Sequence, residues 1–425
     1  MFVYNIIEIG NYRGNIMENK NRVIFHVDVN SAFLSWEAAY RMHLGSSIDL
    51  RKIPSVVGGD VESRHGIVLA KSMPAKECGI KTGETLYKAR EKCPELVIVP
   101  PNFQLYIMYS DELIEILKEY TPDIQKFSVD ECFLDFTGME HMYKDPVALA
   151  YEIKGRIKKE LGFTVNIGIS NNKLLAKIAS DLKKPDMVHT LYPSQIEEKM
   201  WPLPVEALFM VGKATAPKLH RLNINTIGDL ARYDRNILKQ KFKSFGTMIW
   251  SFANGIENSQ VRSDSHIDVK CIGNSTTQPF DVKDMETARK VLLFLCETVC
   301  LRLRNSKNLC SLVAVSMRNS EFINYSRQRK LDYYTDSTIK VWNIACELFK
   351  EGWKGDAIRN MGVRVSKLCS NDFMQISMFD DRNVEKMRAL DKTIDNIRMK
   401  YGSYAIVRCS FLNSGLNAIN GGYRL

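Results

Sequence analysis

The sequence has no long apolar run. Nowhere in its 425 residues do about 18 apolar residues follow one another, although a membrane-spanning helix needs a segment of roughly that length. The first residues, MFVYNIIEIGNYRG, lack the basic start of a secretory signal and carry Glu8 within their apolar part. We therefore expect no membrane span and no secretory signal, and we predict a cytoplasmic protein.

Cysteine pairs with metal-binding or redox spacing are missing as well. The ten cysteines are scattered and include no C-x-x-C motif; the nearest two, Cys296 and Cys300, are four residues apart in a segment with a helical pattern. This distribution disfavours both a disulfide framework and a structural zinc site. The thiols are expected to be reduced.

Nothing in the bulk composition is typical of a disordered or fibrous chain, since 45% of the residues are apolar and 25% are charged. About three domains are expected at this length. The charge is uneven, because residues 201–370 hold 26 basic and 16 acidic residues, which accounts for the whole net charge of +10. Such a region is typical of a polyanion-binding surface, although a solvated basic face without a ligand would look the same.

The first 200 residues have the pattern of an α/β or α+β sheet. Residues 22–29, RVIFHVDV, are predicted to form a strand, followed by a turn and a helix over 33–42. A small block over 53–98 follows, and from 97 to 183 the predicted strands and helices alternate. We expect the helices of this part to pack on one face of the sheet.

Four prolines between 185 and 204 mark a boundary, after which the pattern changes. Residues 206–258 are predicted to be all-helical, and the polar segment 259–267 has the character of a linker. From 268 to 370 the pattern predicts the order β, α, β, β, α, β, which indicates a separate α+β module. The remaining 55 residues are predicted to be a tail with one helix, over 384–400.

Carboxylates interrupt two of the predicted strands. Asp28 ends the first strand, and Asp130 and Glu131 lie within the apolar segment FSVDECFLDF. Buried carboxylates are costly unless a cation compensates them, and Mg²⁺ prefers such hard oxygen ligands. The three side chains could hold two Mg²⁺ ions for phosphoryl transfer, or they could be solvated acids at strand ends. Because adjacent strand residues face opposite ways, Asp130 and Glu131 need a local turn to share a site.

A helix lined with lysines is predicted after Ser170, in the segment NNKLLAKIASDLKKP. Lys173, Lys177 and Lys184 fall within a narrow arc beside an apolar face. Lys184 precedes a proline, which should take it out of helical geometry and leave its ammonium free to reach a triphosphate. The plainer interpretation is an amphipathic surface helix.

Several motifs agree in order and spacing with a known family. The segments HVDVNSAFLSWE, LAKSMPAKECGIKTGE, FSVDECFLDFTG, VNIGISNNKLLAKIASDLKKP and VGKATAPKLHRL resemble the Y-family of translesion DNA polymerases, in its bacterial DinB and UmuC branches. The resemblance implies an α+β multidomain fold shaped like a right hand. Its expected parts are a palm with a ferredoxin-like sheet plus helices (22–33 and 99–192), small fingers (34–98), a helical thumb (193–260), a linker (261–267), an α+β little finger (268–370) and a tail with a clamp-binding peptide (371–425).

The resemblance also implies ligands for the metal ions. Asp28, Asp130 and Glu131 match the metal-binding carboxylates of the family, and the backbone carbonyl of Val29 matches a further oxygen ligand. The cofactor it implies is Mg²⁺, as two ions. This agrees with the reasoning from the carboxylates alone.

Three further residues match positions that bind the incoming nucleotide. Phe33 matches an aromatic steric gate, whose ring leaves no room for a 2′-hydroxyl; it could also be a core aromatic. Lys184 matches a lysine that contacts the triphosphate. Lys76 stands where most relatives have a triphosphate-binding arginine, and Met73 stands where a tyrosine is usual. Lysine keeps the charge but loses the bidentate fork of arginine.

DNA contacts are implied in two regions. The segment MVGKATAPKLHRL resembles a helix-hairpin-helix, with Gly212 at the turn and Lys213 beside it, although Met210 replaces the first glycine of the usual pattern. The 268–370 module resembles a domain that grips duplex DNA. Its candidate phosphate contacts are Arg302, Arg304, Lys307, Arg327, Arg329 and Lys330, unless some of them are ordinary surface charge.

A short peptide in the tail resembles the sliding-clamp motif of bacterial polymerases. In QISMF, Gln375 would form hydrogen bonds while Met378 and Phe379 fill an apolar pocket on the clamp. Binding there would raise the effective concentration of the enzyme at the primer end.

The function that these features imply is template-directed, low-fidelity DNA synthesis past damaged bases. The expected partners are primer-template DNA, deoxynucleoside triphosphates and the bacterial sliding clamp, with no membrane partner, and the chain is expected to act as a monomer. Two alternatives remain open at this stage: a non-catalytic adaptor that binds DNA and the clamp, and a nucleotidyl cyclase or nuclease that uses similar paired metals.

Overall fold

The computed structural model describes residues 22–60, 64, 66–262, 269–371, 383–402 and 405–411. These residues form two compact units. One unit contains the described residues of 22–59 and 67–262, and the other contains residues 60, 64 and 66 and those from 269 onward. Each unit is described by itself below. The predicted clamp peptide, with Gln375, Met378 and Phe379, lies outside the described residues.

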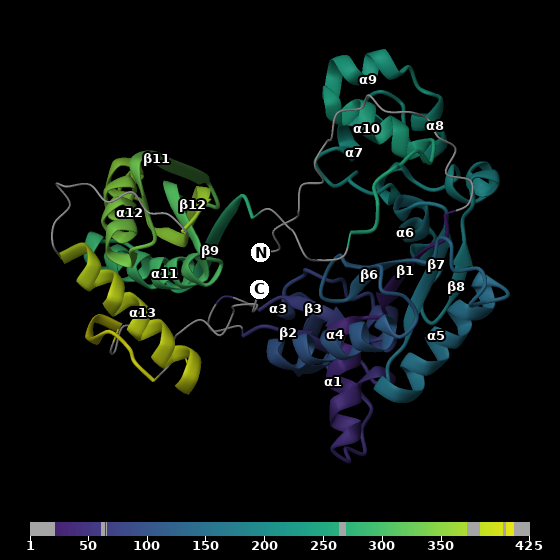
Figure 1. Ribbon diagram of the computed structural model, residues 1–425, viewed down its shortest axis with the longest axis horizontal. Helices are drawn as coiled ribbons and strands as arrows, with labels where there is room; N and C mark the ends of the chain where they lie inside the picture. The colour runs from purple at the N-terminus through teal and green to yellow at the C-terminus, as the bar shows by residue number, and fades with distance from the viewer. Residues whose placement is uncertain are drawn as a thin grey trace. The chain divides into compact units, whose positions relative to one another are not determined.

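A five-stranded sheet forms the centre of the first unit (Figure 1). The strand order is β5-β6-β1-β7-β8, and β1 pairs antiparallel with both β6 and β7. All six residues of β1 are buried. The strands are β1 (Ile24–Val29), β5 (Ile124–Lys126), β6 (Glu131–Asp135), β7 (Val165–Ser170) and β8 (Val188–Thr190).

Helices cover both faces of this sheet, so the expectation that they pack on one face was wrong. On one face, α4 (Phe103–Lys118) and α5 (Pro146–Leu161) share a core with alternate residues of β1 such as Phe25 and Val27. On the other face lies α6 (Lys173–Asp181), whose Ala176 packs with Ile24. Alternate strand residues point to opposite faces, and the continuous burial of β1 reflects its two covers.

Gly168 explains how closely α6 approaches the sheet. A Cβ atom at Gly168 would lie 2.0 Å from the carbonyl oxygen of Ala176 and 2.4 Å from the backbone nitrogen of Ser180. No side chain fits in that space. The lack of a side chain at Gly168 therefore allows α6 to pack this closely on β7 and β1.

A smaller sheet is inserted between β1 and α4. Its order is β3-β2-β4, with β2 antiparallel to β3 and parallel to β4. Leu34 and Ala38 of α1 pack on this sheet, whereas Trp36 of the same helix packs in the core of the larger one. The elements are α1 (Ala32–His43), η1 (Leu50–Lys52), β2 (Ser55–Gly58), β3 (Val68–Lys71), α2 (Met73–Glu77), α3 (Leu86–Lys92) and β4 (Val97–Val99).

The rest of the first unit is helical, as the sequence predicts, and shares an apolar core with Leu174, Leu175 and Ile178 of α6. Short segments lead into four helices, seen at the upper right of Figure 1. These elements are η2 (Pro193–Gln195), η3 (Ile196–Met200), η4 (Val205–Ala207), α7 (Ala216–His220), α8 (Ile227–Arg232), α9 (Arg235–Phe242) and α10 (Ser244–Ala253). We call residues 193–262 the helical region.

The second unit is a four-stranded antiparallel sheet with two long helices on one face. Its order is β11-β10-β12-β9, and its elements follow the predicted order β, α, β, β, α, β. Both helices contribute to a core with one side of the sheet. The elements are β9 (Cys271–Val282), α11 (Met285–Asn305), β10 (Asn308–Asn319), β11 (Asn324–Thr335), α12 (Thr338–Gly352) and β12 (Ile358–Ser370).

The predicted tail helix is part of the second unit. It is α13 (Asn383–Tyr401), followed by η6 (Cys409–Phe411), and ion pairs attach it to the rest of the unit. Arg304 of α11 binds Asp395 of α13, and Arg388 of α13 binds Asp336. Phe411 packs against Phe294 with ring centroids 5.9 Å apart. The helix is therefore docked.

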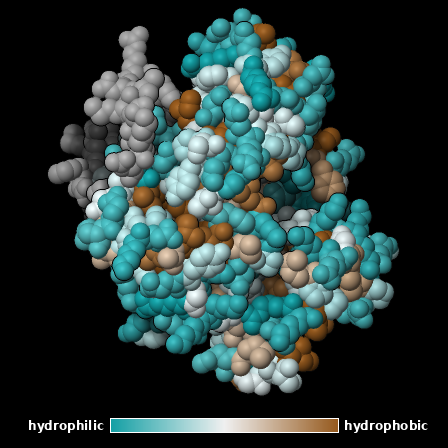
Figure 2. Space-filling view, turned by 90° about the vertical axis from the view of Figure 1, so that its right-hand side faces the viewer, coloured by the Kyte–Doolittle hydropathy of each residue, from teal (hydrophilic) through white to brown (hydrophobic). Residues whose placement is uncertain are grey.

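Among the described residues, no helix combines the length and the apolar character needed to cross a membrane. The face of the molecule in Figure 2 mixes apolar side chains with a larger number of hydrophilic ones.

Candidate active site

Three carboxylates meet at one end of the five-stranded sheet. Asp28 of β1 lies opposite Glu131 of β6 in the antiparallel register, and side chains at such paired positions share one face of a sheet. Asp130 precedes β6 in a bend over 128–130, so the local turn required by the sequence is present. Its carbonyl accepts a hydrogen bond from the backbone N–H of Val29 at 3.0 Å. The structure thus brings Asp28, Val29, Asp130 and Glu131 together.

Burial and mutual repulsion act on these carboxylates. Burial raises the pKa of Asp28 to about 7; the nearby charge of Lys184 opposes this rise, and the charges of Glu131 and Asp130 add to it. Burial also raises the pKa of Asp130. The hydrogen bond that Asp130 Oδ1 accepts from the Ser128 hydroxyl at 2.5 Å opposes this rise. The carboxylates lie within electrostatic reach of one another and lack a full complement of positive charge.

Lysines from α6 and the turn after it face this cluster. Lys177 Nζ lies 2.7 Å from Glu131 Oε1. Lys184 Nζ contacts Asp28 Oδ2 and lies 2.8 Å from Asp181 Oδ1. Lys184 is therefore held by two carboxylates, and the expectation that its ammonium is free was wrong, because the buried Asp28 is the nearest opposite charge. Lys173 instead bonds to Gln125 and to the carbonyl of Gln260.

A buried histidine that sequence reasoning missed completes the cluster. The Nδ1 atom of His26 lies 2.7 Å from the Ser180 hydroxyl, which donates to the Lys177 carbonyl. Its Nε2 atom is 3.9 Å from Glu131 Oε2 and has no hydrogen-bond partner. Burial lowers the pKa of His26 well below 6.5, and the charges of Lys177 and Lys184 act in the same direction. The imidazole is neutral at neutral pH.

The donor set fits a hard divalent cation by its chemistry. It offers carboxylate and carbonyl oxygens, two raised carboxylate pKa values and an unpartnered imidazole nitrogen beside Glu131. Within the described part of the chain, however, no three His, Cys, Asp or Glu side chains are arranged as a ready-made metal cage. Lys184 and Lys177 are ion-paired with Asp28 and Glu131, so a metal cation could bind these oxygens only if the ion pairs opened.

Phe33 lies at the start of α1, five residues after Asp28. Its half-buried ring stacks on Tyr106 of α4, with centroids 4.5 Å apart and an angle of 9° between the planes. The Tyr106 hydroxyl donates to Glu37 Oε1 at 3.2 Å. This hydrogen bond holds the Tyr106 ring in position beside Phe33. Tyr106 was not identified from the sequence, because the two rings are far apart along the chain.

Lys76 lies exposed on α2, beside the smaller sheet. Partial burial lowers the pKa of Lys71, and the nearby charge of Lys76 lowers it further. Lys71 Nζ donates to the Thr82 hydroxyl at 3.2 Å. The two lysines form a small electropositive area at this end of the smaller sheet.

One residue of the expected helix-hairpin-helix turn has a backbone conformation typical of glycine. Met210 has a φ angle of +75°, a conformation that glycine adopts easily and methionine rarely. Gly212 and Lys213 are exposed, and the Gly212 carbonyl accepts from the backbone N–H groups of Thr215 and Ala216.

Several of the predicted phosphate contacts in the second unit are engaged by other parts of the protein. The side chain of Arg304 is 7% exposed and bonded to Asp395, which leaves its guanidinium little surface for a phosphate. Arg329 binds Glu347 and Glu351 of α12. Arg327 lies next to Gly352 at the end of α12. Both β11 arginines thus lie on the face that the helices cover. Arg302, half-buried on α11, stays a prediction.

The other face of this sheet carries Lys330, which was predicted from the sequence, and further residues that sequence reasoning missed. Gln328 and Arg364 lie in register with Ala314 of β10, Lys330 lies in register with Leu312, and Arg318 lies in register with Asn324 and Asn360. Four rows of paired residues cross this face of the sheet, and none of their sixteen residues is an aspartate or a glutamate. We call this surface the open face. Its residues are Cys271, Gly273, Ser275, Thr277, Leu312, Ala314, Ser316, Arg318, Asn324, Ser326, Gln328, Lys330, Asn360, Gly362, Arg364 and Ser366. Strand alternation was the signal that could have found them.

Comparison with known proteins agrees with this architecture. The impB/mucB/samB family matches residues 27–181, and the C-terminal domain of the same family matches residues 269–378. DNA polymerase IV of Clostridium acetobutylicum is 52% identical over 396 residues, covering 92% of this chain and 98% of that protein. DNA polymerase IV of Acetivibrio thermocellus is 40% identical, covering 94% and 100%. DNA polymerase IV 2 of Bacillus subtilis is 38% identical, covering 93% and 96%.

A solved structure shares the fold. A Y-family DNA polymerase chimera of Dbh and Dpo4 superimposes with a TM-score of 0.70 at 22% identity, covering 82% of this chain and all of that chain. The α+β multidomain polymerase fold expected from the sequence is confirmed.

Proposed function

This chain belongs to the Y-family of DNA polymerases, in its DinB branch, and on that premise we propose that it carries out translesion DNA synthesis by two-metal nucleotidyl transfer. The primer 3′-hydroxyl attacks the α-phosphate of a deoxynucleoside triphosphate, and pyrophosphate leaves. The observation that carries the proposal is the register of Asp28 with Glu131, with Asp130 in the adjoining bend.

Each residue of the cluster has a part in this reaction. Asp28, Asp130, Glu131 and the Val29 carbonyl would hold two Mg²⁺ ions, which when bound supply the positive charge that activates the attacking hydroxyl and neutralises the leaving pyrophosphate. Lys184, about a third exposed, would turn from Asp28 to the triphosphate. Lys76 would contribute a second positive charge from the smaller sheet.

Phe33 would act as the steric gate. Its ring stacks on that of Tyr106, and this contact would restrict its movement away from a bulkier sugar. A ribonucleotide would then be excluded by overlap with its 2′-hydroxyl.

The small insertion between β1 and α4 would act as the fingers. Its sheet has three strands of three or four residues each. So small a subdomain would press on the new base pair over a limited area, which suits damaged templates at the expense of shape discrimination.

DNA would be held by the helical region as thumb and by the second unit as little finger. The turn with Gly212 and Lys213 offers exposed backbone and charge to a phosphate. The open face offers Arg318, Lys330 and Arg364 on a surface of small polar side chains. The clamp peptide, Gln375 with Met378 and Phe379, remains a proposal from its sequence alone.

Primer extension by the purified chain tests the proposal. Asp130→Asn should lower the rate of nucleotide incorporation about a thousandfold, since several kcal/mol of charge stabilisation is lost. The matched control is Asp111→Asn, an exposed carboxylate on α4. Full activity of the Asp130 variant would remove the assigned site.

The same assay decides against the adaptor alternative. An adaptor would bind primer-template DNA and incorporate nothing, even with the unmodified chain. Incorporation by the wild-type chain that depends on Asp28 and Glu131 excludes it, and analysis of the product separates polymerisation from cyclase or nuclease chemistry.

A further inference from the structure

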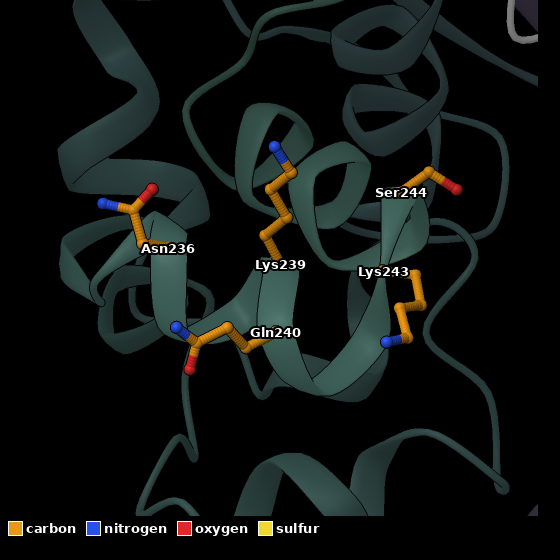
Figure 3. Close-up of a pocket in the computed structure, with 5 residues that line it drawn as sticks. All are labelled: Asn236, Lys239, Gln240, Lys243 and Ser244. Carbon is orange, nitrogen blue, oxygen red and sulfur yellow. The ribbon is translucent and has the colours of Figure 1, made fainter.

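Lysines of the first unit differ in how firmly the fold holds them. An open depression of the surface at the corner of α9 and α10 is lined by Asn236, Lys239, Gln240, Lys243 and Ser244 (Figure 3). In the described part of the chain, its two lysines form no ion pair with a carboxylate. Lys184 differs from both, because carboxylates hold its ammonium and buried amides hold the backbone on either side of it.

A short turn between α6 and β8 carries Lys184. We call residues 183–187 the lysine turn; its first three residues are exposed. At the start of the turn, the Lys183 carbonyl accepts a hydrogen bond from Asn166 Nδ2 at 2.7 Å. At its end, the backbone N–H of Met187 donates to Asn166 Oδ1 at 3.2 Å. One side chain of β7 therefore holds both ends of the lysine turn.

The amide of Asn166 is fully buried and fully used. Its Nδ2 atom also donates to the Ser180 carbonyl at 2.9 Å, and its Oδ1 atom also accepts from Asn30 Nδ2 at 3.0 Å. Both N–H donors and both acceptor sites of the amide are thus occupied. The backbone partners determine which way the amide points, because a carbonyl can only accept and an N–H can only donate.

Asn30 supports this arrangement from the end of β1. Its side chain is buried, and its Oδ1 atom accepts from the backbone N–H of Asp186 at 2.9 Å and from the Thr164 hydroxyl at 2.9 Å. Asn30 follows Asp28 by two residues. The lysine turn is therefore tied to the same stretch of backbone that carries Asp28.

The strand register places Asn166 beside the carboxylate cluster. Asp28 pairs with Glu131 on one side and with Asn166 on the other, so the three side chains form a row on one face of the sheet. A buried amide is costly unless all of its hydrogen bonds are made, and an apolar side chain could fill the same space. What the satisfied amide adds at this position is a defined geometry.

We propose that Asn166 is a positioning residue for Lys184. It fixes the backbone of the lysine turn, so that the flexible side chain of Lys184 reaches from a constant base towards the phosphates of an incoming nucleotide. The inference rests on the proposed polymerase function and adds to it a residue that acts through another. A loosened turn would weaken nucleotide binding in the ground state and in the transition state alike, which raises KM and leaves kcat unchanged.

Steady-state primer extension by the full chain tests this role. Asn166→Ser keeps a polar group but is too short to bond both Lys183 and Met187. We expect the KM for the deoxynucleotide to rise about tenfold, the size of one lost hydrogen bond, while kcat stays within about twofold of wild type. The matched control is Asn172→Ser at another buried asparagine, where serine can still cap α6; its KM should equal that of wild type.

A double variant separates positioning from a general loss of stability. If Asn166 acts through Lys184, Asn166→Ser should add nothing once Lys184→Ala is present, so the double variant should have the KM of Lys184→Ala alone. An undiminished rise of KM in the Lys184→Ala background would overturn the proposal. An unchanged KM in Asn166→Ser alone would overturn it as well.

Amide hydrogen exchange gives a measurement that does not depend on activity. The backbone N–H groups of Asp186 and Met187 should exchange faster in Asn166→Ser than in wild type and in Asn172→Ser, since they lose their acceptors. Equal exchange in all three proteins would contradict the proposal. Should Asn166→Ser not fold, Thr164→Val removes only the hydroxyl that donates to Asn30 and should raise KM by a smaller factor; an unchanged KM there would count against the proposal.

Failure of this role is distinguishable from failure of the polymerase function. A wild-type chain that extends no primer would contradict the proposed function, whatever the exchange rates in the lysine turn. A wild-type chain that extends primers, with a KM that Asn166→Ser leaves unchanged, would contradict only the positioning role.

Discussion

Lys184 and Asp28 are 156 residues apart in the chain, yet the ammonium of one contacts the carboxylate of the other at the end of β1. Lys177 makes the equivalent contact with Glu131. Burial raises the pKa of Asp28, and the charge of Lys184 opposes that rise. Each of the two carboxylates is thus ion-paired with a lysine from α6 or the turn after it.

Sugar selection should depend on the stack of Phe33 on Tyr106. We expect Phe33→Ala to increase the relative incorporation of ribonucleotides at least about tenfold, because the ring that occupies the space of the 2′-hydroxyl is removed. Steady-state incorporation of paired ribo- and deoxynucleotides measures this. Tyr106→Phe keeps the stack and loses only the hydrogen bond to Glu37, so its selectivity should match wild type; unchanged selectivity in Phe33→Ala would reject the gate.

His26 should make the first unit less stable in mild acid. The unfolded chain binds a proton at His26 near pH 6.5, whereas the folded chain, with a lowered pKa, does not. The contribution of His26 to stability therefore decreases as the pH falls below 6.5. The raised pKa values of Asp28 and Asp130 act in the opposite direction over the same range, because the folded chain takes up protons there, so the effect of His26 is isolated by comparison with a variant. In urea titrations between pH 5 and 7, His26→Gln should gain stability relative to wild type as the pH falls, whereas the exposed control His141→Gln should follow the wild type; parallel curves for His26→Gln and wild type would contradict the prediction.

The buried pair of Arg304 and Asp395 should matter far more than an exposed one. Asp395→Asn removes the nearer of two carboxylates from a guanidinium that is 7% exposed and leaves Asp391, 3.6 Å away, as its counter-charge; we expect a loss of about 2 kcal/mol in the stability of the second unit, the size of a hydrogen bond to a charged group. Glu286→Gln breaks an ion pair with Lys290 on the surface of α11 and should cost less than about 0.5 kcal/mol. Chemical denaturation measures both variants. Equal losses of stability in Asp395→Asn and Glu286→Gln would contradict a stabilising role for the buried ion pair between α11 and α13.

Two glycines should respond to alanine with opposite signs. Gly168→Ala places a methyl group 2.0 Å from a backbone oxygen and should destabilise the protein by about 3 kcal/mol. Gly155→Ala meets no atom within 4 Å on the helix α5 and should stabilise by about 0.5–1 kcal/mol. Unfolding midpoints of the two variants give the comparison directly, and a stable Gly168→Ala would contradict the close approach of α6.

DNA affinity should depend on the open face and less on the arginines of β11. Arg364→Ala should lower the salt slope of duplex binding by about 1. Arg329→Ala should leave that slope unchanged, because its guanidinium is engaged by Glu347 and Glu351. An equal change in both would mean that the β11 ion pairs open on DNA.

The carboxylates could be proposed from the sequence because they interrupt apolar segments, a signal that by itself also fits solvated acids at strand ends, and because they match the motifs of the family. Asp28 ends an apolar strand and Asp130 interrupts another, and the requirement for a turn between Asp130 and Glu131 follows from strand geometry alone. The order of strands and helices in both units could be predicted for the same reason, since each element has its own periodicity.

Contacts between distant parts of the chain could not be found in this way. Nothing near Phe33 indicates that Tyr106 lies beneath it, and nothing near Arg304 indicates a helix ninety residues later with Asp395 on its inner face. The face of the sheet on which Arg327 and Arg329 lie depends on the register of β11 with β10. A shift of one residue in this register would move both side chains to the other face.

The position of β11 at the border of its sheet gives its arginines a use that does not involve DNA. A border strand has unpaired backbone groups that can recruit a strand from another molecule and start aggregation. Arg327, Arg329 and Lys330 place three positive charges along this border. A foreign strand that paired with β11 would have to displace water from these charges, or Glu347 and Glu351 from Arg329. Charge at this border is therefore expected to oppose the addition of a strand from another copy of the chain.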